Sequence, residues 1–163
     1  MTFSEFLNGI FSGNTLALIG AALAVFMAGI GSARGVNMVS KASLGLLSED
    51  PSKFGKTFAL QALPMTQGLY GFIVAFLILM NMKAGIFGDS PALTVNQGAY
   101  YLMSALPIAI VGYYSAIKQG EVATAGVLAI AKRPSELGKV IISATLVETY
   151  AILAAVISLL LVL

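Results

Sequence analysis

Four long runs of apolar residues fill most of the chain, and polar residues gather mainly between them. The runs cover about residues 14–47, 51–82, 97–131 and 134–163. Each run is longer than the ~20 residues that a helix needs to cross the hydrocarbon core of a bilayer. Because lipid offers the backbone no hydrogen-bond partners, a single segment that spans it must be helical. The pattern therefore predicts an all-α membrane protein with four transmembrane helices.

The two short connections between the runs have the same design. Residues 48–53 join the first run to the second, and residues 131–136 join the third to the fourth. Each connection has a proline, Pro51 or Pro134, at the expected first position of the next helix, where a missing N–H costs nothing. We therefore expect two tandem helical hairpins, over residues 1–82 and 97–163. Residues 83–96 form a longer outer connection between them.

The second hairpin repeats the first at an offset of 83 residues. A fixed spacing of this kind marks one structural unit used twice. Both copies run in the same direction, so the duplication is parallel and not inverted. The matched positions are Pro-Ser-x-x-Gly-Lys at residues 51–56 and 134–139 and, without a gap, Gly29 with Gly112, Ser32 with Ser115, and Thr66 with Thr149.

Charged residues are few, and the basic ones lie mainly at one end of the predicted bundle. Positive residues favour the cytoplasmic side of a membrane, so we expect both tight loops in the cytoplasm. Both termini and the middle connection are then outside. The basic residues on the loop side are Lys41, Lys53, Lys56, Lys132, Arg133 and Lys139, against Lys83 near the other side.

Composition excludes several classes of function. Of the 163 residues, 58% are hydrophobic and 10% are charged, with no cysteine and no histidine. A soluble domain has about 25% charged residues, so an integral membrane protein is expected. Disulfides, thiolate metal sites and imidazole catalysis are excluded. A net charge of +2 is too small to indicate nucleic-acid binding, and no Gly-x-x-x-x-Gly-Lys-[Ser/Thr] loop for nucleotide phosphates is present.

Glu148 is the most informative residue, because it lies near the middle of the apolar run 140–163 and is the only charge in it. A carboxylate at the centre of a transmembrane helix costs at least about 2.5–3.5 kcal/mol. In the repeat it falls opposite Met65, so one hairpin carries the acid and the other does not. The expected role is to handle an ion, a proton or a charged substrate.

Other oxygen-bearing groups are expected at a similar depth in the membrane. Leu63, Thr66, Gln67 and Tyr70 share one face of the second helix, and Pro64 distorts the turn so that a backbone carbonyl becomes available. Gln119 lies near the middle of the third helix. Hard oxygen donors suit Na⁺ and other hard cations, so we expect Na⁺, with a proton as the alternative. Taken singly, Thr66 and Gln67 also fit plain hydrogen bonding between helices.

The first and third helices are rich in small residues at helical spacing. Such residues let helices approach closely in lipid, either within one chain or in a crowded inner ring of several copies. Arg34, Lys118 and Glu121 also lie within these helices, and we expect Lys118 to pair with Glu121. The small residues are Gly20, Ala24, Ala28 and Ser32 in the first helix, and Gly112, Ala116 and Gly120 in the third.

Two segments carry a resemblance to a known family. Residues 60–72 read LQALPMTQGLYGF and residues 147–153 read VETYAIL. Together with the doubled hairpin they resemble the membrane proteolipid (the c or K type) of V-type rotary ATPases, in particular its sodium-translocating bacterial branch. The likeness extends from about residue 16 to residue 163.

The resemblance implies a homo-oligomeric ring that turns in a bacterial cell membrane, with the first and third helices inside and the second and fourth outside. It implies Na⁺ binding by the Leu63 carbonyl, Thr66, Gln67, Gln119 and Glu148, with Tyr70 supporting the carboxylate. It also implies a stator membrane subunit with an arginine, and central-stalk subunits that contact the loops near Asp50 and Lys53 and near Lys132 and Ser135. ATP is hydrolysed on other subunits, so this chain is not an enzyme by itself.

Two functions from other classes compete with this interpretation. A small four-helix cation or drug antiporter also carries one membrane glutamate, but its helices are usually shorter and it lacks a parallel hairpin repeat. A structural channel-like or junction-forming proteolipid would need no set of ion ligands. Na⁺ binding to the purified oligomer separates these possibilities.

Overall fold

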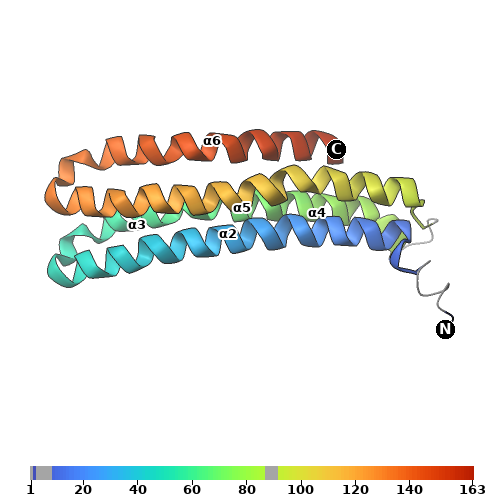
Figure 1. The fold of residues 1–163 in the computed structure, drawn as a ribbon, viewed down its shortest axis with the longest axis horizontal. Coiled ribbons are helices and arrows are strands. Elements are labelled where there is room, and N and C mark those ends of the chain that lie inside the picture. Colours follow the sequence, from blue (N-terminus) through green and yellow to red (C-terminus); the bar gives the residue numbers. More distant parts are fainter. Residues whose placement is uncertain (1, 3–8, 87–91) are drawn as a thin grey trace.

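Long helices lie side by side in one elongated bundle, with two tight turns together at one end and the C-terminus at the other (Figure 1). The computed structural model describes residues 2, 9–86 and 92–163, and these contain helices and no strand. Four segments are long and apolar enough to cross a membrane: Gly13–Glu49, Pro51–Met82, Val95–Lys132 and Pro134–Val162. The predicted all-α fold of a multi-pass membrane protein is therefore confirmed. The main helices are α2 (Gly13–Glu49), α3 (Phe54–Ala62), α4 (Thr66–Ile86), α5 (Val95–Lys132) and α6 (Leu137–Val162).

The second span is one helix with an interruption at Pro64. A 3₁₀ turn, Leu63–Met65, separates α3 from α4. Pro64 has no N–H and its ring crowds the preceding turn, so regular α-helical bonding cannot pass through it. The hydroxyl of Ser32 on α2 supports the break: its Oγ accepts from the Gly68 N–H at 2.8 Å and lies 3.5 Å from the Met65 carbonyl oxygen. The expected distortion is present and is held by the neighbouring helix.

The connection between the two hairpins is shorter than the segment 83–96 assigned to it from the sequence. α4 continues to Ile86, and α5 begins at Val95. The early start of α5 has a local cause. Thr94 Oγ1 accepts from the Gln97 N–H while the Gln97 side chain accepts from the Thr94 N–H, a capping box that satisfies backbone donors at the helix start.

Small residues bring α2 and α5 into close contact within one chain. A Cβ added to Gly20 would lie 2.8 Å from the Cα of Leu102, and one added to Gly31 would lie 2.7 Å from the Cα of Tyr113. Ala24 and Ala28 are fully buried. Close backbone approach of this kind is the main means of packing helices in lipid. The small residues therefore serve packing inside the chain.

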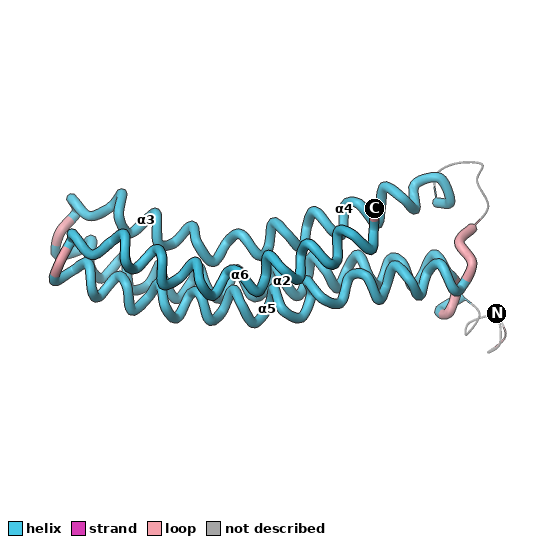
Figure 2. The backbone as a smooth tube through the Cα atoms, turned by 90° about the horizontal axis from the view of Figure 1, so that it is seen from above, coloured by secondary structure: helices cyan, strands magenta, loops and turns pink. Residues whose placement is uncertain are grey.

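The two tight turns lie together at one end of the bundle (Figure 2). At this end, lysines of the first hairpin bind the turn of the second. Lys53 Nζ donates to the Ala131 carbonyl at 3.1 Å, and Lys56 Nζ donates to the Pro134 carbonyl at 3.2 Å. Asp50 accepts from Ser52 and pairs with Lys53 at 3.1 Å, and these contacts hold the pKa of the Asp50 carboxyl below its ordinary value. Their contribution is present at neutral pH and is lost as the pH falls through that lowered pKa.

Replacing Gly31 with Val tests the close contact of α2 with α5. The added side chain meets the Tyr113 backbone, and overpacking of this kind costs about 1–3 kcal/mol. We expect the free energy of unfolding in detergent, followed by circular dichroism, to fall by that amount. Gly45→Val is the matched control on the same helix, because a Cβ at Gly45 meets nothing within 4 Å. Equal effects of the two substitutions would contradict the contact.

Candidate functional site

The carboxylate of Glu148 is buried in the bundle and is held by neutral donors from two other helices. Its side chain is 7% exposed. Tyr70 Oη of α4 donates to Oε1 at 2.8 Å, and Gln119 Nε2 of α5 donates to Oε2 at 3.2 Å. The three ion pairs found among the described residues involve other acids. A buried carboxylate without a cation depends on such hydrogen bonds, because desolvation of its charge is costly.

Two fully buried glutamines extend this network from α5 to α4. Gln67 Nε2 donates to Gln119 Oε1 at 2.6 Å, and Gln119 then donates to Glu148. Each carboxamide therefore has a set orientation, with the nitrogen of one on the oxygen of the next. The consequence is that Gln67 Oε1 points away from Gln119 and is available to other partners.

Thr66 and Leu63 complete the polar face of the broken helix. Thr66 Oγ1 lies 3.0 Å from the Leu63 carbonyl oxygen and 3.3 Å from Gln67 Oε1. Leu63 begins the 3₁₀ turn at Pro64, and its carbonyl also accepts from the Thr66 N–H. The six residues predicted from the sequence thus form one connected network, from Leu63 through Thr66, Gln67 and Gln119 to Glu148 and Tyr70.

Ser115 belongs to the network but received no chemical role from the sequence. Its Oγ donates to the Val147 carbonyl at 3.0 Å and accepts from Gln67 Nε2 at 3.4 Å. With Ser115 and Gln119 as acceptors, both N–H groups of the Gln67 carboxamide are used. The repeat contained a signal for a role of Ser115, because Ser115 matches Ser32 at the same offset of 83 residues. Ser32 binds the backbone of the second span, and Ser115 binds the backbone of the fourth span.

Several polar residues near the site in sequence lie away from it in space. Thr145 and Thr149 are exposed, and Thr149 Oγ1 donates to its own helix at the Leu146 carbonyl. Tyr150 is 68% exposed.

The three charged residues within the first and third spans, Arg34, Lys118 and Glu121, also form contacts of their own. Lys118 pairs with Glu121 at 3.0 Å, as predicted, and both side chains are exposed. Arg34 donates to the Tyr113 hydroxyl, and its guanidinium carbon lies 5.7 Å from the centre of that ring. All three therefore lie outside the network around Glu148.

The oxygen atoms of the network that could bind a cation are hard ligands, and together they carry one negative charge. Its acceptors are carboxylate, carboxamide, hydroxyl and carbonyl oxygens, which suit hard cations or a proton. The described residues contain no group of three or more His, Cys, Asp or Glu side chains that could hold a metal ion. One acid in a site closed by neutral groups is balanced by one positive charge.

Two copies of a hairpin around one buried acid define a membrane proteolipid of the double-hairpin type. The family model for the ATP synthase C subunit matches the chain twice, at residues 19–78 and 102–161, so the chain belongs to the ATP synthase C-subunit family. The two matches start 83 residues apart, which confirms the repeat seen in the sequence.

Two relatives narrow the comparison. The chain is 48% identical over 151 residues to V-type sodium ATPase subunit K of Enterococcus hirae, with 93% of this chain and 92% of the relative covered. It is 42% identical over 146 residues to A-type ATP synthase subunit K of Methanocaldococcus jannaschii, with 90% of this chain and 61% of the relative covered. The predicted membership among rotary ATPase proteolipids is confirmed.

Removing the two glutamines one at a time and together tests the chain of hydrogen bonds. Gln119→Leu leaves Gln67 Nε2 and Glu148 Oε2 without their partner, and an unsatisfied buried group costs about 1–3 kcal/mol. Gln67→Leu with Gln119→Leu removes both partners of the 2.6 Å contact. We expect the double variant to lose less free energy of unfolding than the sum of the two single variants. Strict additivity would mean that the carboxamides do not interact.

Proposed function

We propose that this chain is a rotor-ring subunit of a V-type ATPase that binds Na⁺ at Glu148 and carries it across the membrane. The buried Glu148 carboxylate, surrounded by neutral oxygen and amide groups, is the observation that carries the proposal. Family membership and the name of the Enterococcus hirae relative support it. The antiporter and junction-forming alternatives are not favoured, because the chain matches the ATP synthase C-subunit family and a V-type sodium ATPase subunit.

The proposed ligands of Na⁺ are oxygens that the network already orients. Glu148 supplies the charge, and Gln67 Oε1, Thr66 Oγ1 and the Leu63 carbonyl supply neutral oxygens. Gln119 and Tyr70 donate to the two carboxylate oxygens and so keep the carboxylate turned toward α4. Hydrogen bonds of this kind hold ligands in place before the ion arrives.

The coupling of binding to rotation is electrostatic. Glu148 with bound Na⁺ is close to neutral, so the loaded site can face lipid at low cost. Bare Glu148 in the hydrocarbon core is expensive. It is therefore stable only beside a positive group, which we propose is an arginine of a stator membrane subunit. The ring can turn only when each site is either loaded or beside that arginine.

The rest of the machine lies in other chains. Copies of this subunit form a homo-oligomeric ring, each with hairpins 1–82 and 97–163 and an outer connection around 83–96. The ring lies in a bacterial cell membrane with the tight loops in the cytoplasm. There the loops near Asp50 and Lys53 and near Lys132 and Ser135 contact central-stalk subunits. ATP is hydrolysed on other subunits, and this chain carries the ion.

Glu148→Gln tests the site directly. The substitution keeps size and removes the charge, so we expect equilibrium binding of ²²Na⁺ to the purified oligomer to be abolished while the oligomer still forms. Labelling of Glu148 by dicyclohexylcarbodiimide in the unmodified protein should be prevented by Na⁺. Na⁺ binding retained in Glu148→Gln would overturn the site. Protection by low pH with no effect of Na⁺ would identify the proton as the transported ion.

Ser115→Ala tests whether the serine positions Gln67. Loss of one buried hydrogen bond costs about 0.5–1.5 kcal/mol, so we expect Na⁺ affinity to fall roughly 2–12-fold. Ser104→Ala is the control, since Ser104 is also buried on α5 but donates to its own helix at the Tyr101 carbonyl. Ser115→Thr retains a hydroxyl and should restore part of the affinity. A decrease of the same size in Ser104→Ala would contradict the role of Ser115.

A further inference from the structure

Helix α4 starts in the middle of the second span, where its first backbone groups need partners from outside the helix. The first N–H groups of a helix have no acceptor within that helix, and lipid supplies none. The Leu63 carbonyl accepts from the first of these groups, the Thr66 N–H. The residue before α4 is Met65, whose exposed side chain ends in a thioether and has no oxygen to offer. The start of α4 therefore requires an acceptor from elsewhere.

Ser32 of α2 supplies this acceptor. Its Oγ accepts from the Gly68 N–H at 2.8 Å, and Gly68 is the third residue of α4. A capping side chain normally belongs to the residue before the helix and accepts from the second or third N–H of that helix. Ser32 has the chemistry and the target of such a cap, although it lies on a different helix.

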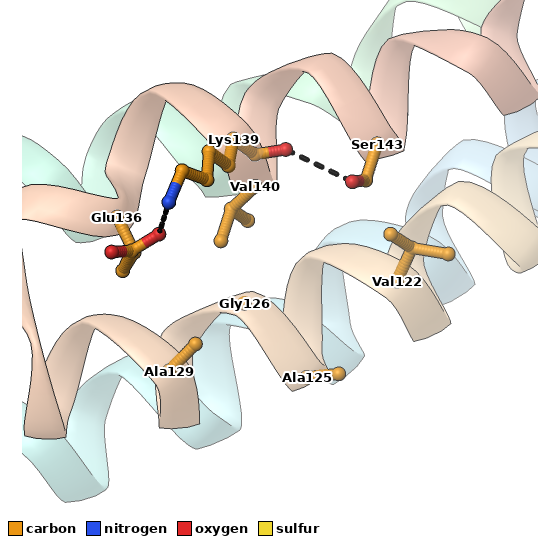
Figure 3. A pocket seen from close by; sticks show the side chains of 8 residues that line it. All are labelled: Val122, Ala125, Gly126, Ala129, Glu136, Lys139, Val140 and Ser143. Carbon is orange, nitrogen blue, oxygen red and sulfur yellow. Dashed lines mark hydrogen bonds and ion pairs between the residues drawn. The ribbon is translucent and has the colours of Figure 1, made fainter.

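Other serines show that this bond depends on the interruption at Pro64. A serine inside a helix can donate to its own backbone, and Ser143, beside the groove between α5 and α6, donates to the Lys139 carbonyl at 2.9 Å (Figure 3). Ser115, which matches Ser32 in the repeat, donates to a carbonyl of α6. Because α6 runs without a break here, its N–H groups are used within the helix. Only the broken span presents an N–H for a serine to cap.

Close packing fixes Ser32 against the break. A Cβ added to Gly35 would lie 2.7 Å from the Cβ of Pro64, so α2 lies directly on the interrupted turn. A Cβ added to Gly68 would lie 3.1 Å from Ser32 Oγ. Ser32 is itself buried. Its hydroxyl therefore has little freedom to leave the Gly68 N–H.

The two backbone atoms near Ser32 Oγ lie on either side of two proposed ligands. The Gly68 nitrogen is 2.8 Å away and the Met65 carbonyl oxygen is 3.5 Å away, and the residues between them are Thr66 and Gln67. The direction of a side chain on a helix follows from its backbone. We propose that Ser32 is a positioning residue for Na⁺: by capping α4 from α2, it fixes the backbone from which Thr66 and Gln67 present their oxygens. This role rests on the proposed function of the site.

The positioning applies to Na⁺ and not to a proton. A proton needs only the Glu148 carboxylate on α6, which accepts from Gln119 of α5 and from Tyr70, a residue beyond the capped turn of α4. Na⁺ in the proposed site also needs the neutral oxygens of the second span. Loss of the cap therefore weakens Na⁺ binding and leaves protonation of Glu148 nearly unchanged.

Ser32→Ala tests the cap in the purified oligomer. We expect the Kd for ²²Na⁺ to rise roughly five-fold, the factor that corresponds to the loss of a typical helix cap. Ser43→Ala is the matched control and should leave the Kd unchanged. Ser43 is on the same helix and fully buried, but its hydroxyl has no hydrogen-bond partner among the described residues. Equal Kd values for the two variants would overturn the positioning role.

A pH profile separates positioning from a general loosening of the bundle. Dicyclohexylcarbodiimide reacts with a protonated carboxyl, so the pH of half-maximal labelling without Na⁺ reports the protonation of Glu148. We expect this pH to be the same in Ser32→Ala and in the unmodified protein, while the Na⁺ concentration that prevents labelling rises. A shift of the pH profile as large as the shift in Na⁺ protection would mean that the carboxylate itself is disturbed, and would overturn the proposal.

Gly68→Ala reaches the same bond from its other partner, and it serves if Ser32→Ala does not assemble. The added Cβ displaces the Ser32 hydroxyl from the N–H. Gly55→Ala is the control, because a Cβ at Gly55 meets nothing within 4 Å. Protection of residues 66–70 against amide hydrogen exchange should fall in Gly68→Ala and in Ser32→Ala, but not in their controls. Unchanged protection would overturn the cap.

The outcomes for the cap and for the proposed function are distinct. An unmodified oligomer that binds no ²²Na⁺ would overturn the proposed function and the positioning of Na⁺ together. An unmodified oligomer that binds Na⁺ no more tightly than Ser32→Ala would overturn the positioning and leave the function of the site in place.

Discussion

A single carboxylate inside an apolar bundle has to be stabilised by neutral groups, and much of the structure is arranged around this constraint. Tyr70 and Gln119 each donate to one oxygen of Glu148. Gln119 in turn is oriented by Gln67, and Gln67 by Ser115. Because each donor depends on the next, the site extends through three helices although its charge is on one residue. A buried carboxylate is costly unless a positive charge or a proton balances it.

The duplicated hairpin supplies the two halves of this site from unlike positions. In the first copy Pro64 interrupts the helix, and its polar face offers Thr66 and Gln67. The second copy has a regular helix at this point and carries the acid. Met65 matches Glu148 in the repeat, yet Met65 is 50% exposed and Glu148 is buried. The copies have diverged so that the first provides Thr66, Gln67 and Tyr70 to the network and the second provides its acid.

Close approach of α2 and α5 has a purpose beyond stability. Gly31 and its neighbours let the two helices meet backbone to backbone, which places Ser32 against the break in the second span. There its hydroxyl satisfies the Gly68 N–H, and α4 can restart with Thr66 and Gln67 turned inward. Small residues of α2 thus pack against both α5 and the second span. The second hairpin has Tyr114 and Lys118 where the first has Gly31 and Gly35.

Local patterns in the sequence were sufficient for the four apolar spans and their parallel repeat, and they predicted the residues that lie together around Glu148. Each of these follows from rules that act over a few residues: apolar length, proline at a helix start, helical spacing, and the cost of a charge in lipid. The start of α5 was placed too late, because the capping box of Thr94 lies in a polar stretch that looks like loop. The role of Ser115 was missed for a different reason. A serine in an apolar helix is ordinary, and its value comes from bonds to Gln67 and to the Val147 carbonyl, which lie on other helices. Residue type and spacing determine which groups reach a given depth, but only the rotation and separation of packed helices decide which of them touch.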